Sequence, residues 1–410
     1  MSAPACRLCG SPLEHVFADL GMSPLANAFV PAERAAAMEP FYPLRALVCG
    51  DCLLVQLEEY ETPSGIFTDY AYFSSYSSTW VEHSRRYADV VSERFGIGPE
   101  KRVVELASND GYLLQFFHER GVPVLGVEPA ANVAKVAIQK GIPTLVEFFG
   151  VETARSLADD TPADLIIANN VLAHVPDAHD FVAGIEALLA PNGIATLEFP
   201  HLMQLMSHCE FDTIYHEHFS YFSLATVQRL FDEHGLRVFD VEELPTHGGS
   251  LRLYVARTSD GTHPDDERVA GLAARERDAG LESLETYTAF GDAVKERKRR
   301  IVSGLIELKD AGQRIAGYGA PAKANTLLNY CGIGPDLIEF TVDRNPHKQG
   351  SLLPGSRIPI LAPEALAESR PDVIVVLPWN LRDEILDQLS YVREWGARFA
   401  IPGQGLEVLP

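Results

Sequence analysis

The feature that most constrains the fold is an alternation of short apolar runs with helical stretches, which begins near residue 101. The stretch "KRVVELASNDGYLLQFF" has the pattern of a strand, a turn and a helix, and "GVPVLGVEPAANVAKVAIQKG" repeats that order. Two further apolar runs, in "ADLIIANNVLAHVPD" and "NGIATLEFPH", end in polar residues, and "LRVFDVEELPTHGGSLRLYVAR" has the pattern of an antiparallel strand pair. The alternation predicts a parallel sheet covered by helices, which binds ligands beyond the carboxyl ends of its strands.

A second unit of the same kind is predicted near the C-terminus. "RIAGYGAPAKANTLLNY" has the pattern of a strand, a glycine turn and a helix, and "PDVIVVLPWN" adds another strand. Backbone N–H groups at the start of that helix, beside Lys323, would suit an anion such as a diphosphate. The segment "VDRNPHKQGSLLPG", with Lys348, is a candidate for the second wall of this anion site. Plain packing of the strand against the helix is the alternative. The charged helical stretch that begins this part contains "KERKRR", a run typical of a solvated helix face.

Four of the six cysteines form two pairs, Cys6 and Cys9 in "CRLC" and Cys49 and Cys52 in "CGDC". A two-residue gap lets both thiolates of a pair face one ion, and two pairs complete the four-sulfur shell that zinc prefers. Two disulfides are the alternative, but a cytosolic chain seldom keeps them. A closed shell leaves no open position for substrate, so we predict a structural zinc ion that holds a small N-terminal module. We expect the other two cysteines to be ordinary buried residues.

Composition excludes several classes of protein. The chain has 34 Lys+Arg against 57 Asp+Glu, a formal charge of -23, and no basic cluster, which argues against a nucleic-acid partner. No apolar run reaches the roughly 18 residues that a membrane span needs, and the N-terminus lacks the pattern of an export signal. At 410 residues and 46% hydrophobic content, we expect two or three cored domains in a cytoplasmic protein with no membrane partner. The oligomeric state is left open, with a monomer as one option.

The first strand, turn and helix suggest a cofactor site. Glu105 lies in the strand, Gly111 ends the turn, and Glu128 closes the next strand. A glycine lets the backbone approach a ligand closely, and a carboxylate at the end of the second strand can accept both hydroxyls of a ribose. The pattern suits an adenosine cofactor. A dehydrogenase is disfavoured because the G-x-G-x-x-G turn of dinucleotide-binding proteins is absent.

The stretch "FDTIYHEHFSYFS", residues 211–223, concentrates histidines, tyrosines and a glutamate. A histidine is a natural base near neutral pH because its reference pKa is roughly 6.5. Aromatic and histidine residues at this density also occur in ordinary core helices. A metal site at His216, Glu217 and His218 is the third interpretation, but these neighbours do not share one helix face as the histidines of H-E-x-x-H do.

Several motifs occur together in a specific order: the paired-cysteine module, "VVELASNDGYLL" with "GVEPAANVA", then "NNVLAHVPD", "LEFPH", "YHEHFSYFS", "HGGSLR" and "GYGAPAKANTLLN". In this order, over nearly the whole chain, the sequence resembles the sugar C-methyltransferases, which act on thymidine-diphosphate-linked (dTDP) 4-keto deoxysugars in natural-product biosynthesis. The resemblance implies a zinc-binding module (residues 1–68), a central Rossmann-like domain that binds S-adenosylmethionine (69–258), and a second Rossmann-like domain that helps to bind the nucleotide-sugar (259–410).

The resemblance also implies roles for individual residues. His218 matches the second histidine of the family's "YHEH" motif and is the implied base, and Glu217 and Tyr215 match positions that assist it. Tyr215 could hydrogen-bond the oxygen that becomes the enolate, and His174 lies at a strand end facing the same crevice. His216 is a neighbour that can point elsewhere.

The remaining predicted site residues are of two kinds. The residues expected to bind the cofactor are Glu105, Ala107, Asn109, Gly111, Tyr112, Leu113, Glu128, Pro129, Asn132, Asn169 and Asn170. The residues expected to bind the dTDP-sugar are Tyr72, Tyr76, His201, Tyr221, His247, Arg252, Lys323, Asn325 and Lys348. We expect methylation at carbon 3; carbon 5, an O- or N-methyltransferase, and a non-enzymatic nucleotide-binding protein are the alternatives.

Overall fold

The computed structural model describes residues 4–62, 65 and 73–410, and these form two compact units. The first unit comprises residues 1–13, 49–203 and 219–282, and the second comprises residues 14–48, 204–218 and 283–410. Each unit therefore combines stretches that are far apart in the sequence. The two units are described separately below.

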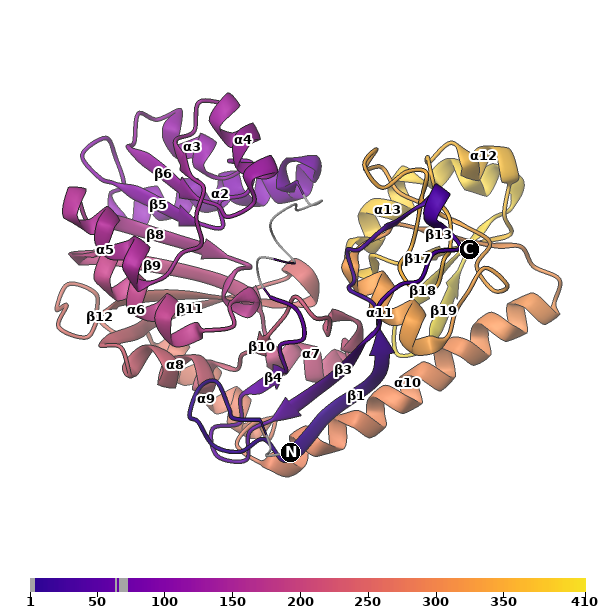
Figure 1. The fold of residues 1–410 in the computed structure, drawn as a ribbon, viewed down its shortest axis with the longest axis horizontal. Coiled ribbons are helices and arrows are strands. Elements are labelled where there is room, and N and C mark those ends of the chain that lie inside the picture. The colour runs from indigo at the N-terminus through magenta and orange to yellow at the C-terminus, as the bar shows by residue number, and fades with distance from the viewer. Residues whose placement is uncertain (1–3, 63–64, 66–72) are drawn as a thin grey trace. The chain divides into compact units, whose positions relative to one another are not determined.

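The first unit contains a seven-stranded sheet in the order β11-β12-β9-β8-β5-β6-β7 (Figure 1). Neighbouring strands from β7 to β9 are parallel, whereas β12 is antiparallel to both β9 and β11. The predicted parallel sheet and its closing antiparallel pair are therefore confirmed. The strands are β5 (Val103–Leu106), β6 (Val124–Val127), β7 (Thr144–Leu145), β8 (Ala163–Asn169), β9 (Leu189–Pro200), β11 (Leu236–Leu244) and β12 (Ser250–Arg257).

Helices pack on this sheet through apolar stripes. In α2, Tyr87 and Val91 lie in one core cluster with the strand residue Ile167. The Ser77 side chain caps the start of α2, and Gly96, with a positive φ of 63°, ends it. The helical segments of this unit are η2 (Ser74–Tyr76), α2 (Ser78–Phe95), α3 (Leu114–His118), α4 (Ala131–Gln139), α5 (Val151–Asp160), η3 (Leu172–His174), α6 (Ala178–Leu188), α8 (Leu224–Asp232), η5 (Thr246–Gly248) and α9 (Glu267–Asp278).

A short strand pair completes the first unit. Strand β4 (Val55–Leu57) is antiparallel to β10 (Ser220–Tyr221), with Gln56 opposite Ser220 and Val55 opposite Tyr221. The pair joins the strand that follows the second cysteine pair to the C-terminal part of the histidine motif. Helix α7 (Leu202–His208) begins in the first unit and ends in the second.

The second unit contains a six-stranded sheet in the order β16-β14-β13-β17-β18-β19, parallel except for the last pair. The predicted strand, glycine turn and helix are β13, the turn at Gly319 and α11. The strands are β13 (Ile315–Tyr318), β14 (Thr341–Val342), β16 (Ile360–Leu361), β17 (Val373–Val376), β18 (Arg398–Pro402) and β19 (Leu406–Leu409). Two more pairs are β1 (His15–Ser23) with β3 (Tyr42–Val48), and β2 (Val30–Pro31) with β15 (Ser351–Leu352).

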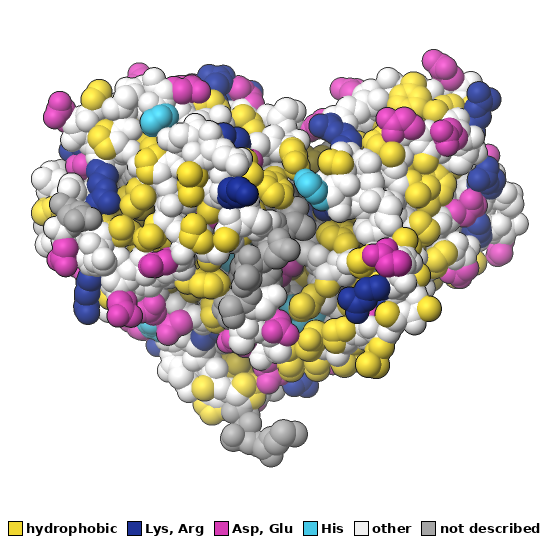
Figure 2. All heavy atoms as spheres, turned by 45° about the horizontal axis from the view of Figure 1, so that its top comes forward, with side chains coloured by type: hydrophobic (Ala, Val, Ile, Leu, Met, Phe, Trp, Pro, Cys, Tyr) yellow, Lys and Arg dark blue, Asp and Glu magenta, His cyan; other side chains and the backbone are white. Residues whose placement is uncertain are grey.

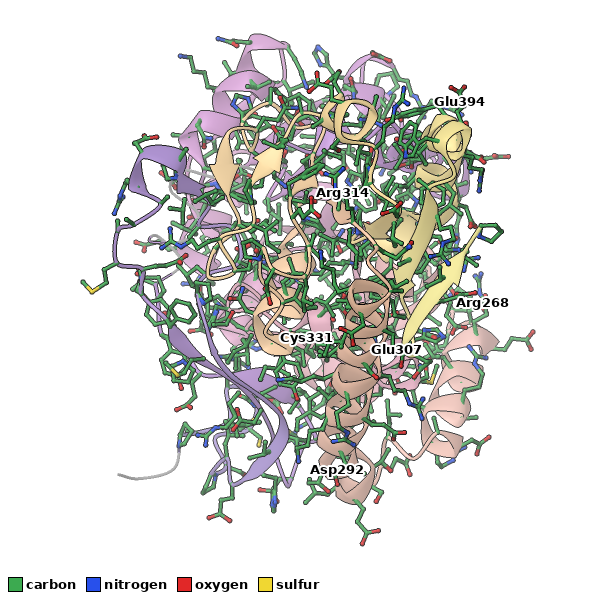
Figure 3. All side chains as sticks on the ribbon, turned by 90° about the vertical axis from the view of Figure 1, so that its right-hand side faces the viewer. Arg268, Asp292, Glu307, Arg314, Cys331 and Glu394 are labelled. Atoms are coloured by element: carbon green, nitrogen blue, oxygen red, sulfur yellow. The ribbon has the colours of Figure 1, made fainter. Side chains whose placement is uncertain are left out.

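The long helix α10 (Leu284–Asp310) carries the "KERKRR" run. Most of its charged side chains are exposed, as Asp292 and Glu307 illustrate in Figure 3. Arg297 is the exception: it is 3% exposed, and its guanidinium donates to the carbonyls of Pro402 (2.8 Å), Gly403 (2.6 Å) and Cys209. The prediction of a wholly solvated face is therefore wrong at Arg297, because this side chain satisfies carbonyls that loops bring into the interior.

The other helical segments of the second unit are short. They are η1 (Ala32–Arg34), η4 (Phe211–Thr213), α11 (Ala322–Cys331), α12 (Ala365–Ser369), η6 (Trp379–Leu381), α13 (Arg382–Gln388) and η7 (Ser390–Trp395). Both cysteines outside the pairs, Cys209 and Cys331, are buried free thiols, as predicted.

The predicted α/β fold class is confirmed in both units. Among the described residues, no helix is both long and apolar enough to span a bilayer. On the face drawn in Figure 2, Lys and Arg side chains are scattered among acidic ones and do not gather into a patch.

Candidate functional site

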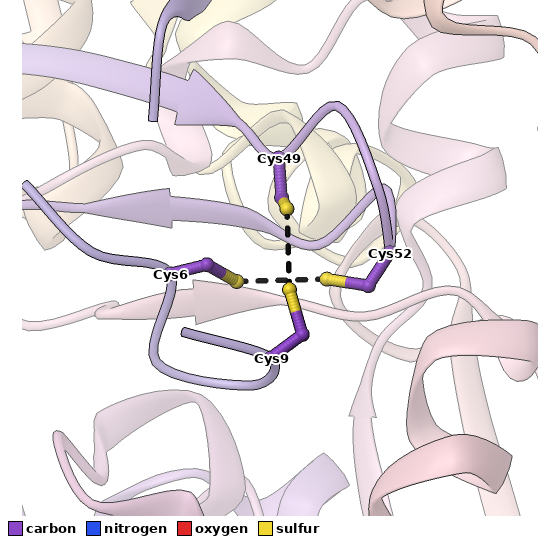
Figure 4. Close-up of side chains that lie close together, drawn as sticks. All are labelled: Cys6, Cys9, Cys49 and Cys52. Carbon is purple, nitrogen blue, oxygen red and sulfur yellow. Dashed lines mark hydrogen bonds between the residues drawn. The ribbon is translucent and has the colours of Figure 1, made fainter. Parts of the chain in front are cut away.

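The four paired cysteines lie together in the first unit (Figure 4). Their sulfur atoms are all within 4.8 Å of one another, and the Cys6–Cys52 and Cys9–Cys49 sulfurs are each 3.5 Å apart. Zinc–sulfur bonds of about 2.3 Å place the sulfurs of a tetrahedral site roughly 3.8 Å apart, so the set fits zinc. All four are free thiols, and the disulfide alternative is wrong.

Each cysteine pair is carried by the same kind of turn. The carbonyl of Cys6 accepts from the N–H of Gly10 at 2.8 Å, and the carbonyl of Cys49 accepts from that of Leu53 at 3.1 Å. The residue after each second cysteine has a positive φ, 78° at Gly10 and 62° at Leu53. In each knuckle, the N–H two residues after the first cysteine also approaches that cysteine's sulfur at 3.4 Å. The matching turns explain how both pairs face one point.

A residue outside the cysteine motifs completes the surroundings of this site. Gln56 is 1% exposed; its Nε2 donates to the sulfur of Cys6 at 3.1 Å, and its Oε1 accepts from the backbone N–H of Arg7 at 3.0 Å. Partners of this kind orient metal ligands and reduce the charge on a thiolate. The sequence gives no signal for Gln56, because its role depends on the pairing of β4 inside the unit.

The carboxyl ends of β5, β6 and β8 carry the predicted cofactor residues. The order of the parallel strands reverses between β5 and β8, and such a switch point is where open α/β sheets bind ligands. Four predicted residues after these strands have positive φ angles. They are Ala107 (55°), Asn109 (50°), Gly111 (75°) and Asn170 (53°).

Glu128 organises this edge. Its Oε2 accepts from the backbone N–H of Asn109 at 2.9 Å and its Oε1 from that of Ala130 at 2.8 Å. The side chain is 5% exposed, and burial raises its pKa against these two hydrogen bonds. Each carboxylate oxygen can accept a second hydrogen bond, so Glu128 retains acceptors for a pair of hydroxyls. Asn109 in turn accepts from the N–H of Ser74 at 2.9 Å, which ties η2 to the turn.

A buried acceptor points to a ligand at the same edge. The Oδ1 of Asn169, at the end of β8, is buried and accepts no hydrogen bond from the described residues. Glu105, in β5, is 1% exposed, and burial raises its pKa well above the usual value. Buried polar groups without partners are rare and require an explanation. A polar group with hydroxyl or amino donors, such as adenosine, fits these residues.

Four other predicted cofactor residues lie near this edge or in the adjoining core. Tyr112 and Leu113 lie in the hydrophobic core cluster of the first unit. Pro129 and Asn132 flank the start of α4, next to Glu128. Their role in cofactor binding stays a prediction.

The histidines of the motif lie in the part of it that belongs to the second unit, residues 211–218, and residues 214–218 form a turn instead of a helix. Tyr215 Oη and His218 Nε2 are 2.8 Å apart, and His218 Nδ1 is 3.0 Å from the carbonyl oxygen of Thr213. A carbonyl only accepts, so Nδ1 carries the proton and Nε2 presents a lone pair to the Tyr215 hydroxyl. A histidine whose tautomer is fixed in this way has a basic Nε2 and can act as a general base.

The other two motif residues point elsewhere. His216 Nε2 donates to the carbonyl of Pro43 at 3.1 Å, and burial lowers its pKa. Glu217 is 2% exposed, and its Oε1 accepts from Asn27 Nδ2 at 2.7 Å. Burial raises the pKa of Glu217 to about 7, against this hydrogen bond and the charge of Lys348. Among the described residues, the four cysteines bring their ligand atoms close enough to hold one metal ion, whereas His216, Glu217 and His218 do not.

Lys323, at the start of α11, has acidic surroundings. Its Nζ donates to Asn380 Oδ1 at 2.8 Å and lies 4.3 Å from the centre of the Trp379 ring. Burial lowers the pKa of Lys323 against the opposing charges of Asp212 and Glu210, and burial also raises the pKa of Glu210 to about 8. Part of the Lys323 charge is therefore already balanced by the protein.

The second predicted wall lies beside the same helix start. Lys348 Nζ donates to the carbonyl of Ala320 at 2.9 Å and is 4.0 Å from Asp343 Oδ2. Asn325 donates to the carbonyl of Ala26, and its Oδ1 is buried without a partner among the described residues. The structure thus places Lys323, Asn325 and Lys348 around one end of the second sheet.

Two predicted substrate residues of the first unit are held by carboxylates. His201 is 1% exposed, and its Nε2 pairs with Glu276 at 2.7 Å. Arg252 forms ion pairs with Glu198 (2.7 Å) and Glu242 (2.9 Å). These contacts hold both side chains in the fold, and substrate binding by either remains a prediction.

The aromatic candidates differ in exposure. His247 has a positive φ of 58° and meets Trp80 edge-on at 5.1 Å between ring centres. Tyr221 is buried in β10, whereas Tyr76 in η2 is 51% exposed. Tyr72 lies outside the described residues.

The sequence analysis missed one polar cluster. His83 in α2 lies 3.0 Å from Glu198 Oε2, and its ring stacks on Trp80 with 4.9 Å between centres. Thr246 donates to the other oxygen of Glu198 at 2.9 Å. Burial raises the pKa of Glu198, but His83 and Arg252 outweigh burial and lower it to about 2. Glu198 is the glutamate of the "LEFPH" motif, so this motif was the sequence signal from which the cluster could have been predicted.

Comparison with known proteins agrees with this geometry. A methyltransferase domain matches residues 80–241, a zinc binding domain matches residues 6–67, and a C-methyltransferase C-terminal domain matches residues 245–402. The fold and the site define a methyltransferase that uses S-adenosylmethionine and contains a zinc-binding module. The chain is 39% identical to the C-methyltransferase NovU of Streptomyces niveus over 97% of this chain and 94% of that protein, and it belongs to the C-methyltransferase family.

More distant similarities cover only part of the chain. A ubiquinone biosynthesis O-methyltransferase of Rhodopseudomonas palustris (strain BisA53) is 23% identical over 30% of this chain and 58% of its own length. The crystal structure of magnesium protoporphyrin IX methyltransferase from Synechocystis PCC 6803 with bound SAH matches 43% of this chain and 83% of that chain, with 14% identity and a TM-score of 0.36.

Proposed function

We propose that this C-methyltransferase methylates a carbon, carbon 3 in our assignment, of a dTDP-linked 4-keto deoxysugar in natural-product biosynthesis. The proposal rests on the resemblance of the ordered motifs and on the similarity to NovU. The observation that carries the chemistry is the tautomer of His218, whose Nδ1 is held by Thr213. The domain boundaries 1–68, 69–258 and 259–410, and a cytoplasmic location where the free cysteines stay reduced, belong to the same proposal.

His218 is proposed to remove the proton from the carbon next to the ketone. Its Nε2 lone pair accepts that proton, and the substrate becomes an enolate whose carbon is nucleophilic. Tyr215 donates to Nε2 at 2.8 Å, and it can turn its hydroxyl to the enolate oxygen when Nε2 takes up the proton. Glu217 and His174 are proposed to assist. When bound, S-adenosylmethionine supplies an electrophilic methyl group.

The remaining residues are proposed to bind and orient. Glu128 accepts the ribose hydroxyls of the cofactor, and Asn169 accepts a donor of its adenosine part. Lys323 and Lys348 offer cationic groups to the diphosphate, each already partly balanced by a nearby acid. The proposed further contacts to the sugar nucleotide are from Tyr72, Tyr76, His201, Tyr221, His247, Arg252 and Asn325.

The test is methyl transfer from labelled S-adenosylmethionine to a panel of dTDP-4-keto sugars, with the methylated carbon located by NMR. Proton removal is measured separately as exchange of the substrate's alpha proton with deuterium oxide, with S-adenosylhomocysteine in place of the methyl donor. His218→Asn should lose both activities by about 100- to 10,000-fold, the usual contribution of a general base.

A neighbouring histidine gives the matched control. His216→Asn changes a ring that is bound to Pro43, and it should retain both activities. Near-normal exchange by His218→Asn would refute the assignment of the base. Methylation at carbon 5 would correct the assigned position. Methylation of oxygen or nitrogen without exchange of the alpha proton would indicate an O- or N-methyltransferase. Absence of turnover on every acceptor would favour a binding protein.

A further inference from the structure

We infer that Arg7, which stands between the zinc ligands Cys6 and Cys9, is a positioning residue that couples the zinc knuckle to the catalytic segment. The inference rests on the proposed role of His218, because Phe219 follows His218 directly in the chain. No motif in the sequence singles out Arg7.

The side chain of Arg7 binds three acceptors in and next to the β4–β10 pair. Its Nη1 donates to the carbonyl of Phe219 and, at 3.3 Å, to the hydroxyl of Ser220. Its Nη2 donates to the carbonyl of Leu57 at 2.9 Å, and the guanidinium carbon lies 5.6 Å from the centre of the Phe219 ring. A planar guanidinium can bind acceptors in two directions at once, which a lysine ammonium does less rigidly.

The backbone of Arg7 is itself fixed by the zinc site. Its N–H donates to Gln56 Oε1, and the amide of the same Gln56 donates to the sulfur of Cys6. The next residue, Leu8, accepts from His179 Nε2 at 2.9 Å. When zinc holds the knuckle closed, the Arg7 side chain therefore extends from an immobile base.

Phe219 is held from the opposite direction as well. Its N–H donates to the carbonyl of Ala173 at 2.7 Å, and its carbonyl also accepts from the N–H of Leu57 at 3.0 Å. Ala173 directly precedes His174, the second histidine assigned to the reaction. The backbone neighbours of both histidines thus meet at Phe219, and Arg7 holds the carbonyl of that residue.

This arrangement gives the zinc ion a role in activity although it is remote from the chemistry. A displacement of about 1 Å in a catalytic group can reduce turnover by about 100-fold. Loss of Arg7, or opening of the knuckle, should release the Phe219 carbonyl and let the adjoining residues shift. Zinc should therefore support catalysis in addition to stabilising the N-terminal module.

The test compares Arg7→Gln and Arg7→Lys with the parent enzyme and with Arg34→Gln, an exposed arginine in η1. Zinc content is measured by mass spectrometry of the metal, and backbone exposure by hydrogen–deuterium exchange of the peptide spanning residues 219–223. Turnover is measured with the sugar identified in the panel assay. We expect Arg7→Gln to retain one zinc per chain, to exchange at least tenfold faster in this peptide, and to lose 10- to 100-fold in kcat with KM for S-adenosylmethionine unchanged.

Arg7→Lys should recover part of the kcat and part of the protection of residues 219–223 from exchange, and Arg34→Gln should match the parent in both. If Arg7→Gln loses its zinc, Ser220→Ala removes only the weakest of the three bonds and should show a smaller change in the same direction. Unchanged peptide exchange and unchanged kcat at full zinc content would overturn the inference. Failure of the proposed base would look different. In that case His218→Asn would still exchange the alpha proton of the substrate with deuterium oxide. The faster hydrogen–deuterium exchange of residues 219–223 in Arg7→Gln does not depend on which residue is the base.

Discussion

Replacing Glu217 with Gln should change how the stability of the second unit depends on pH. The carboxyl is 2% exposed, its Oε1 accepts from Asn27, and its Oε2 is buried without a partner among the described residues. The charge that faces it is the ammonium of Lys348, which in turn lies near Asp343. Gln has the same shape as a protonated Glu and keeps the oxygen that Asn27 contacts.

The magnitude follows from the pKa of Glu217, which burial raises from 4.5 to about 7. An acid with a raised pKa in the folded protein holds its proton more tightly there than in the unfolded chain. Between pH 4.5 and 7 the folded state therefore binds more protons, and stability falls as the pH rises through this window. Each pKa unit corresponds to 1.36 kcal/mol, so raising the pKa from 4.5 to about 7 costs the folded protein about 3 kcal/mol when Glu217 is ionised. This loss of stability is absent below pH 4.5 and complete above pH 7.

The assay is urea unfolding of the parent and of Glu217→Gln from pH 4.5 to 8.5. Fluorescence reports mainly on the second unit, because two of the three tryptophans, Trp379 and Trp395, lie there. As the pH rises from 4.5 to 8.5, the free energy of unfolding of the variant should increase by about 3 kcal/mol relative to that of the parent. Glu33→Gln, which removes an exposed carboxylate, is the control. A stability difference that stays constant with pH would refute the argument.

Three further changes test other parts of the molecule. Glu128→Ala should weaken S-adenosylmethionine binding by one or two charge-assisted hydrogen bonds, about 1.5 to 3 kcal/mol each; an unchanged affinity by calorimetry would remove the assignment. Cys6→Ser should release zinc and loosen the N-terminal module, and a full metal content in the purified variant would contradict the four-sulfur site. Arg252→Met leaves the buried carboxylate of Glu198 without its guanidinium and should lower stability by about 3 to 5 kcal/mol, whereas an unfolding midpoint equal to that of the parent would show that His83 and Thr246 together satisfy Glu198.

Much of the fold was predictable because the signals are local. The knuckles depend on cysteines two residues apart, and each strand, turn and helix is contained in about 20 residues of sequence. The tautomer of His218 is also local in origin, since Thr213 lies five positions away. The domain boundaries near residues 68 and 258, and the roles of the site residues, stay predictions.

The contacts that could not be predicted join distant positions. His83 and Glu198 are 115 residues apart, and Asn27 and Glu217 are 190 apart. Such pairs depend on strand order and on which segments share a unit, and a single sequence does not encode either as a pattern. Arg297 was misjudged for a related reason: local charge predicted a solvated face, and burial came from loops about 90 to 105 residues away.

The pairing of β4 with β10 has a consequence for synthesis of the chain. The ribosome completes the second knuckle at Cys52 but adds Tyr221 only 169 residues later (221 − 52). At roughly 5 to 20 residues per second, this delay is about 10 to 30 s. During that interval the nascent knuckle can already hold zinc, while the edge of β4 that will receive β10 has no partner. In a cell short of zinc the knuckle would be open as well during this interval, and an unpaired strand edge beside an unformed knuckle is prone to pair with other chains.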